Sequence, residues 1–147
     1  MLPPFTIRDY KATDYNEMVI LWEKIGLGAA NRGDVPEVIE RTLKTGGRLL
    51  VMTEPGTGEI IGTSWLTVDG RRTYLHHFGI AGTWQGRGLS KPLLEASLEI
   101  AISTGFQVKL EVHSSNVKAI NLYKSFGFSY LGDYDVYIIR DILSALR

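Results

Sequence analysis

A glycine-rich turn between an apolar strand and a long apolar helix constrains this chain more than any other feature. Its sequence is Thr83-Trp84-Gln85-Gly86-Arg87-Gly88-Leu89-Ser90. Gly86 and Gly88 carry no Cβ, so the backbone can curl tightly there and approach an anionic ligand closely. The amides that open the following helix lack intrahelical partners, and they lie at the positive end of the helix dipole. We therefore expect the turn to bind the diphosphate of a cofactor.

The helix after the turn is predicted from apolar residues at helical spacing, namely Leu89, Leu93, Leu94, Leu98, Ala101 and Ile102. Two common phosphate-binding turns are excluded here. The dinucleotide fingerprint needs a third glycine where Lys91 stands, and the nucleoside-triphosphate loop needs a Gly-Lys-Ser/Thr ending, which is absent. The pattern that is left is Gln85-x-x-Gly88-x-Ser90.

This pattern resembles the acetyl-CoA loop of the GCN5-related N-acetyltransferases, which reads Gln/Arg-x-x-Gly-x-Gly/Ala. A second segment, from Leu110 to Phe128, resembles the next strand-helix-strand unit of that family, because it contains the run Asn-x-x-Ala-x-x-Leu-Tyr-x-x-x-Gly-Phe. Two ordered motifs, separated by the length of one helix, cover about half of the chain. The sequence is therefore identified as a member of this family.

The resemblance implies an acetyl-CoA site without a metal ion. Backbone groups of Phe78, Gly79 and Ile80 would hold the thioester carbonyl and the pantetheine. A glycine inside a strand often marks a bulge or a close backbone approach, so Gly79 suits a bulge, although an ordinary sheet glycine is the alternative. The remaining cofactor contacts implied by the family motifs are Gln85, Gly86, Arg87, Gly88, Leu89, Ser90, Lys91, Asn116 and Tyr123. Asn116 is also a suitable helix N-cap.

Two residues match catalytic positions of the family. Tyr123 matches the tyrosine general acid, which would protonate the departing thiolate, although its apolar neighbours also suit a buried aromatic. Glu111 matches the base of the ribosomal-protein N-terminal acetyltransferases, although many relatives carry a non-catalytic residue there. His113 shares one strand face with Glu111, while the adjacent His76 and His77 are expected on opposite faces and cannot bind one metal ion together.

The resemblance implies transfer of the acetyl group of acetyl-CoA to a primary amine by direct attack, and the acceptor is not encoded in the motifs. Asn31, Arg32 and Asp34 lie in a segment that lines the acceptor site in this family, although a solvated loop is an equal alternative. Two other functions stay open: a non-catalytic acyl-CoA-binding regulatory domain, and an acetyltransferase of protein N-termini, including ribosomal proteins.

Composition is consistent with one globular domain. The chain has 147 residues, 44% hydrophobic and 22% charged, and we expect a single N-acetyltransferase domain over residues 1–147. Its 16 basic and 16 acidic side chains cancel, so no net field attracts nucleic acid or an anionic membrane. Cysteine is absent, which excludes disulfides and thiolate catalysis. No signal peptide or membrane-length apolar run is visible, so we expect a cytoplasmic location. Dimers are common in the family, so a homodimer is an option.

The expected fold is α/β (α+β), with a mixed, mostly antiparallel sheet of six to seven strands flanked by helices. Residues 5–8, 48–54, 59–68, 74–80 and 107–113 are predicted strands, with turns at Pro55-Gly56-Thr57-Gly58 and Asp69-Gly70-Arg71-Arg72. Helices are expected over 14–25, 36–44, 88–104 and after Asn116. The last strands are expected at 130–131 and 135–139. The strands at 74–80 and 107–113 should be parallel neighbours, joined by the helix at 88–104 and splayed at their carboxyl ends.

Overall fold

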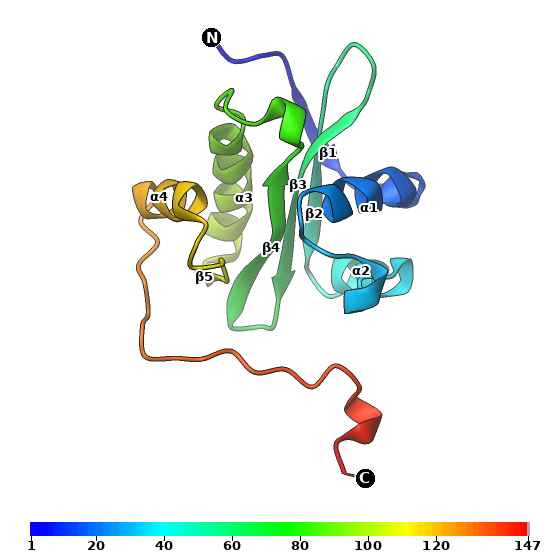
Figure 1. Ribbon diagram of the computed structural model, residues 1–147, viewed down its shortest axis with the longest axis vertical. Helices are drawn as coiled ribbons and strands as arrows, with labels where there is room; N and C mark the ends of the chain where they lie inside the picture. The colour runs from blue at the N-terminus through cyan, green and yellow to red at the C-terminus, as the bar shows by residue number, and fades with distance from the viewer. Residues whose placement is uncertain (147) are drawn as a thin grey trace. The chain divides into compact units, whose positions relative to one another are not determined.

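The computed structural model, which describes residues 1–146, contains a five-stranded sheet in the order β1-β2-β3-β4-β5 (Figure 1). The first four strands pair antiparallel and β5 pairs parallel with β4. Their bounds are Thr6–Asp9, Arg48–Thr53, Ile60–Val68, Arg72–Ile80 and Gln107–Leu110. The mixed α/β sheet and the parallel pairing of β4 with β5 confirm the prediction.

Helices α1 (Tyr15–Lys24) and α2 (Pro36–Lys44) cover one face of the sheet, and α3 (Ser90–Thr104) covers the other (Figure 1). The start of α2 follows from its sequence, because Pro36 occupies the first turn, where no amide is needed. The end of α3 is set by Gly105, whose φ of 73° suits a residue without a Cβ. The crossover from β4 through α3 to β5 makes these two strands parallel neighbours.

Asp14 occupies the N-cap position of α1, yet its side chain does not cap that helix. Its carboxylate instead accepts two hydrogen bonds from Arg8, at 2.8 and 2.9 Å, and one from the amide of Lys11 at 2.8 Å. Because both oxygens are used in this way, Asp14 ties β1 to the short 3-10 turn at Ala12–Asp14.

Alternation along β2 divides the core between the two faces. Leu49 and Val51 pack with Met18, Trp22, Ile39 and Trp65 under α1 and α2. Leu50 and Met52 point the other way and pack with Ile61, Ile80, Leu89 and Leu93 at α3. The α3 face also contains a buried hydrogen bond between the hydroxyls of Ser64 and Ser97, at 2.6 Å. The sheet is therefore buried on both faces.

The chain forms two compact units, Met1–Glu111 and Val112–Arg147, and each is described on its own. The second unit contains α4 (Val117–Ser125) and a short 3-10 turn at Ile142–Ser144. The strands predicted at 130–131 and 135–139 are wrong for the described structure, whose sheet has five strands instead of six to seven. In that segment Val136, Ile138 and Ile139 are exposed. Their sequence has a high propensity for β structure, but it does not pair with a strand of the described sheet.

Candidate active site

The glycine turn lies between the end of β4 and the start of α3. A short 3-10 turn, Gly82–Trp84, leads into it, and Gly86 and Gly88 have φ angles of 77° and 83°. These are left-handed conformations that side chains disfavour, which accounts for both glycines. A Cβ on Gly88 would also approach Leu2 Cδ2 at 3.0 Å. Residues 85–88 of the turn are exposed.

The first turn of α3 begins at Ser90, two residues later than expected, and no side chain caps it. Pro92 falls in this turn, where a missing amide costs little. The side chains around it are engaged locally. Gln85 Nε2 donates to the carbonyl oxygen of Ile80 at 2.8 Å, and the Arg87 guanidinium lies 4.8 Å from the ring centroid of Trp84. Leu89 is a buried core residue. These features suit a cradle of backbone donors for a diphosphate, with Ser90 and Lys91 at its helical end.

Strands β4 and β5 pair over only part of their length. Their register runs from Arg72 opposite Gln107 to Leu75 opposite Leu110, and β4 then continues to Ile80. The predicted strand at 107–113 therefore ends three residues early, at Leu110. The end of the pairing is consistent with strands that separate toward their carboxyl ends.

The bulge in β4 lies one position before the glycine that was expected to form it. Thr63 pairs with Gly79 and Trp65 pairs with His76, so His77 and Phe78 together face Ser64. His77 has a φ of 42°, the left-handed conformation typical of a bulge. Gly79 is in register and is needed for another reason, because a Cβ there would meet Ile25 Cδ1 of the chain after α1 at 2.7 Å. A glycine at position 79 is therefore explained by close packing against Ile25 rather than by the bulge.

One hydrogen bond holds the backbone of the bulge, and a second orients the side chain that donates it. Thr63 Oγ1 donates to the carbonyl oxygen of His77 at 2.7 Å, and Trp22 Nε1 donates to Thr63 Oγ1 at 2.8 Å. The rings of Trp22 and His77 also pack, with centroids 4.3 Å apart. Trp22 and Thr63 are fully buried, so these bonds are shielded from water. Helix α1 thus stabilises the conformation of β4 at the bulge.

The imidazole of His77 contacts the loop between α1 and α2. His77 Nε2 lies 2.9 Å from Asp34 Oδ2, and both side chains are largely buried. Nε2 makes no hydrogen bond in this arrangement, so the contact with Asp34 is a close approach of the two side chains. The carbonyl oxygen of Asp34 accepts a hydrogen bond from the Tyr15 hydroxyl at 2.8 Å. Of the three predicted acceptor contacts, Asp34 is thus fixed against β4.

Asn31 and Arg32 interact within their own loop. The amide of Ala29 donates to Asn31 Oδ1 at 3.2 Å, and Arg32 Nη1 donates to the carbonyl oxygen of Leu27 at 3.3 Å. Both residues are exposed. These bonds match the alternative of a solvated loop, and neither side chain contacts the β4 bulge.

The expectation that His76 and His77 lie on opposite faces is wrong, because the bulge interrupts strand alternation. Both rings lie near Trp65, with centroids 6.2 and 5.4 Å away. His76 Nε2 is also 2.8 Å from Thr67 Oγ1. His76 is an exposed residue, yet partial loss of solvent around its ring lowers its pKa; His77 acts in the same direction, whereas Glu111 and Asp34 oppose it. His76 therefore favours its neutral form, which can accept a proton.

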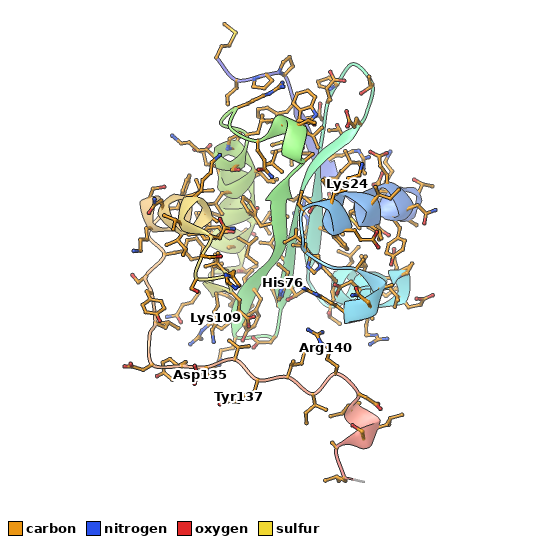
Figure 2. All side chains as sticks on the ribbon, viewed as in Figure 1. Lys24, His76, Lys109, Asp135, Tyr137 and Arg140 are labelled. Atoms are coloured by element: carbon orange, nitrogen blue, oxygen red, sulfur yellow. The ribbon has the colours of Figure 1, made fainter. Side chains whose placement is uncertain are left out.

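Glu111 follows β5 directly, so the parallel register continues it to a place beside His76. Figure 2 shows His76 on β4 and Lys109 on the adjacent strand β5. Glu111 is exposed, and its charge raises the pKa of His76. The structure therefore brings together a carboxylate and an imidazole that sequence reasoning considered separately.

Tyr123, Asn116 and His113 belong to the second unit. Tyr123 is 8% exposed, and burial raises the pKa of its phenol to about 12. Its ring packs edge-on against Phe128, with centroids 5.6 Å apart. Asn116 Oδ1 accepts from the amide of Ala119 at 3.2 Å, which confirms the predicted N-cap of α4. His113 Nδ1 lies 2.7 Å from the hydroxyl oxygen of Ser115.

Residues 1–146 contain no group of three or more histidine, cysteine or acidic side chains that could hold a metal ion. Over the same residues, no helix is both long enough and apolar enough to cross a membrane.

A sequence model described as the acetyltransferase (GNAT) family matches residues 15–128. The chain belongs to this family. The matched segment contains the glycine turn, the β4 bulge, Glu111 and Tyr123, and it continues across the boundary between the two compact units.

Solved structures of this family share the fold. An acetyltransferase of the GNAT family from Staphylococcus aureus Mu50 aligns with a TM-score of 0.76 at 17% identity, over 90% of each chain. A Trypanosoma brucei acetyltransferase aligns with a TM-score of 0.73 at 20% identity, over 92% of this chain and 100% of that one. The ribosomal-protein-S18-alanine N-acetyltransferase from Escherichia coli aligns with a TM-score of 0.68 at 22% identity, over 86% of this chain and 78% of that one. At these identities the likeness shows the fold alone.

Several residues that shape the family site were not singled out from the sequence. Neither Trp22 nor Tyr15, Thr63 or Trp65 received a role in the sequence analysis. A tryptophan at core spacing gives no indication that its indole N–H supports a bulge. Their roles depend on a tertiary contact between α1 and β4, for which the sequence contains no local signal.

Proposed function

We propose that this protein transfers the acetyl group of acetyl-CoA to a primary amine by direct attack, without a metal ion or a covalent enzyme intermediate. The observation that carries the proposal is the exposed glycine turn between β4 and the uncapped start of α3, in a chain of the acetyltransferase family. Bound acetyl-CoA would supply an activated thioester. The residues of this chain would bind it, orient it and move protons.

The turn would hold the diphosphate through backbone donors from Gly86 to Lys91, aided by the dipole of α3. The end of β4, from Phe78 to Ile80, would orient the pantetheine and the thioester through its backbone. The hydrogen bonds from Trp22 through Thr63 to His77 support this role, because they fix the bulge that His77 and Phe78 form. A fixed geometry is itself a large part of catalysis.

The reaction forms a bond between the amine nitrogen and the acetyl carbon and breaks the carbon–sulphur bond. The amine must lose a proton and the departing thiolate must gain one. Two groups are proposed for the amine proton, which either would accept directly or through water: Glu111, as the family motif implies, and His76 beside it, whose lowered pKa favours the neutral form. Tyr123 is proposed to protonate the thiolate, as the family motif implies.

One observation favours a second candidate, a non-catalytic acyl-CoA-binding domain. A phenol with a pKa of about 12 is a weaker acid than an ordinary tyrosine, whose pKa is about 10. Proton transfer from it to a thiolate, whose conjugate thiol has a pKa of about 8.5, is uphill in isolation. If Tyr123 is only a core residue, the turn could still bind acyl-CoA without turnover.

Release of free CoA thiol separates the two candidates. The full chain is incubated with acetyl-CoA and a panel of small primary amines, and in parallel with peptides that have free N-termini. Transfer predicts thiol release that depends on the acceptor, together with a product that is one acetyl group heavier by mass spectrometry. Saturable acetyl-CoA binding without release for any acceptor would favour the regulatory domain. Release with peptides alone would favour the N-terminal acetyltransferase.

We also propose a cytoplasmic location. A homodimer stays a proposal for the assembly. Its test is the molar mass of the full chain in solution by light scattering.

A further inference from the structure

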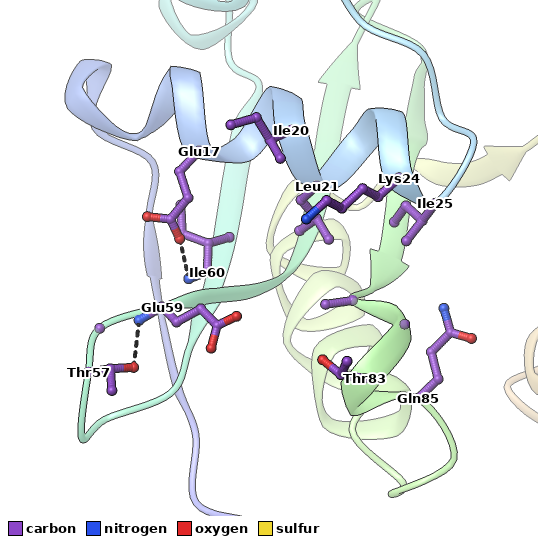
Figure 3. Close-up of a pocket in the computed structure, with 13 residues that line it drawn as sticks. Glu17, Ile20, Leu21, Lys24, Ile25, Thr57, Glu59, Ile60, Thr83 and Gln85 are labelled. Atoms are coloured by element: carbon purple, nitrogen blue, oxygen red, sulfur yellow. Dashed lines mark hydrogen bonds between the residues drawn. The ribbon is translucent and has the colours of Figure 1, made fainter.

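A cavity of about 620 Å³ lies outside the proposed acetyl-CoA contacts, apart from sharing Gln85 (Figure 3). It is bounded by α1, by the turn between β2 and β3, and by the chain that follows β4. The volume is within the range of about 300–1,000 Å³ typical of small-molecule sites. We name it the α1 cavity, and its lining residues are Glu17, Ile20, Leu21, Lys24, Ile25, Thr57, Gly58, Glu59, Ile60, Ala81, Gly82, Thr83 and Gln85.

One wall of the α1 cavity is apolar and comes from consecutive turns of one helix. Leu21 and Ile25, the C-cap residue of α1, are four residues apart, so they lie on the same side of this helix. Ile20 extends this wall and is 52% exposed, which is costly for a large aliphatic side chain on an otherwise polar helix surface. A ligand with an aliphatic segment would cover it.

Opposite charges face the same space. Figure 3 shows the Lys24 ammonium and the Glu59 carboxylate directed into the gap between α1 and the two turns. Among residues 1–146, neither side chain has an ion-pair partner within 4.0 Å. Glu17 differs, because its Oε2 accepts a hydrogen bond from the amide of Ile60 at 2.6 Å, which fixes the carboxylate at the wall. Lys24 can therefore pair with an anionic group of a ligand, and Glu59 can pair with a cationic group.

We propose that the α1 cavity binds a small zwitterion with an aliphatic segment between its charges, such as an ω-amino acid. Its ammonium group lies against Glu59, with Glu17 nearby, and its carboxylate lies against Lys24. Its methylene groups cover Ile20, Leu21 and Ile25. Thr57 and Thr83 provide hydroxyls at the rim for further hydrogen bonds.

The α1 cavity touches the proposed cofactor site at two points. Ile25 closes over Gly79, and Gln85 holds the carbonyl oxygen of Ile80 at 2.8 Å. A ligand that moves either side chain shifts the end of β4, so its binding is coupled to acetyl-CoA binding. This coupling rests on the proposed function, whereas the site itself does not.

The test is a titration of the full chain without acetyl-CoA. It is monitored by the NMR shifts of the backbone amides of the lining residues. The probes are ε-aminocaproate, caproate and hexylamine, which carry two charges, an anion or a cation on aliphatic chains of five or six carbon atoms. We expect saturable binding of ε-aminocaproate with a Kd on the order of 1 mM, and weaker binding of both other probes. Equal affinity for hexylamine and ε-aminocaproate would overturn the zwitterion class.

Lys24→Gln and Glu59→Gln should each weaken binding of ε-aminocaproate by about threefold or more. Glu23→Gln and Lys44→Gln are matched controls, because they make the same charge changes outside the lining. Ile20→Ser should also weaken binding. Because Ile20 is exposed, this replacement should leave the fold intact. An absent saturable shift, or equal affinities in all five variants, would overturn the site.

Turnover is not needed for this titration, so failure of acetyl transfer leaves its result intact. A repeat at saturating CoA should change the Kd for ε-aminocaproate at least twofold. An unchanged Kd, with CoA binding verified by calorimetry, would overturn the coupling.

Discussion

His77 Nε2 on the bulge of β4 lies 2.9 Å from Asp34 Oδ2 in the loop between α1 and α2. The pair joins two segments on which different parts of the proposed reaction depend. The bulge precedes the backbone proposed to orient the thioester, and the loop is the predicted acceptor side. A change at this contact should therefore alter acceptor recognition as well as stability.

We expect Asp34→Asn to lower the free energy of unfolding by about 1–3 kcal/mol, because a largely buried group loses its charged partner. The acceptor KM should rise more than the acetyl-CoA KM. Chemical denaturation and initial rates measure the two effects. Asp9→Asn is the control, since it breaks the exposed pair with Arg48 and should change little. If both variants unfold alike, the contact of Asp34 with His77 contributes nothing measurable.

Gly88→Val should abolish the thermal stabilisation given by acetyl-CoA, because the turn would lose its close backbone approach to the diphosphate. The fold should lose about 1–2 kcal/mol, since φ of 83° strains any β-carbon and the added atom meets only the flexible side chain of Leu2. Gly105→Val imposes the same strain at a φ of 73° outside the turn. It should keep the ligand-dependent shift in Tm. Loss of that shift in both variants would indicate general damage rather than a role of the turn.

Tyr123→Phe should lower kcat by about 10²–10⁴ if the phenol is the general acid, and acetyl-CoA affinity should change little. Stability gives an independent signature. The folded-state pKa of about 12 is above the unfolded value, so the contribution of this phenol is complete below about pH 10 and is lost as pH rises through 12. Across that window the free energy of unfolding of wild type should fall relative to that of Tyr123→Phe, which has no phenol to ionise. Unchanged turnover, with a verified acceptor, would remove the acid role.

Local patterns predicted most of the sheet and helices. The apolar residues Leu49, Leu50, Val51 and Met52 fall in a strand that was predicted at 48–54, and the structure assigns their side chains alternately to two cores. The prediction at the carboxyl end was wrong because a strand requires a partner as well as a β-prone sequence. Val136 and Ile138 have the propensity, yet they lie exposed in the second unit.

The candidate site likewise contains some features that the sequence predicts and one that it does not. The φ angles of Gly86 and Gly88 follow from glycine chemistry and could be predicted from the turn itself. The bulge at His77 could not, because its cause is a buried chain of hydrogen bonds from Trp22 on a distant helix. That bulge also removed the alternation on which the placement of His76 depended.

Asp14→Asn should destabilise the chain at neutral pH and remove part of its acid sensitivity. The hydrogen bond from Arg8 is the main reason that the pKa of Asp14 is lowered. A lowered pKa gives stability that is present above the unfolded value of about 4 and is lost as pH falls through the folded value. Denaturation at pH 7 and below pH 3 should show a difference between wild type and variant that shrinks in acid. A constant difference would mean that the loss comes from packing.

Replacement of Glu111 tests which group accepts the amine proton. Glu111 raises the pKa of His76, so Glu111→Gln should lower that pKa further. If His76 is the base, activity rises with pH as the imidazole loses its proton, and this rise should move to lower pH in Glu111→Gln. His76→Gln should then lose activity at every pH below the pKa of the acceptor amine. If Glu111 itself is the base, its replacement should instead lower activity most at neutral pH, with recovery as the free amine becomes abundant. Profiles of kcat/KM for wild type and both variants distinguish the two assignments, and identical profiles in all three would exclude both residues.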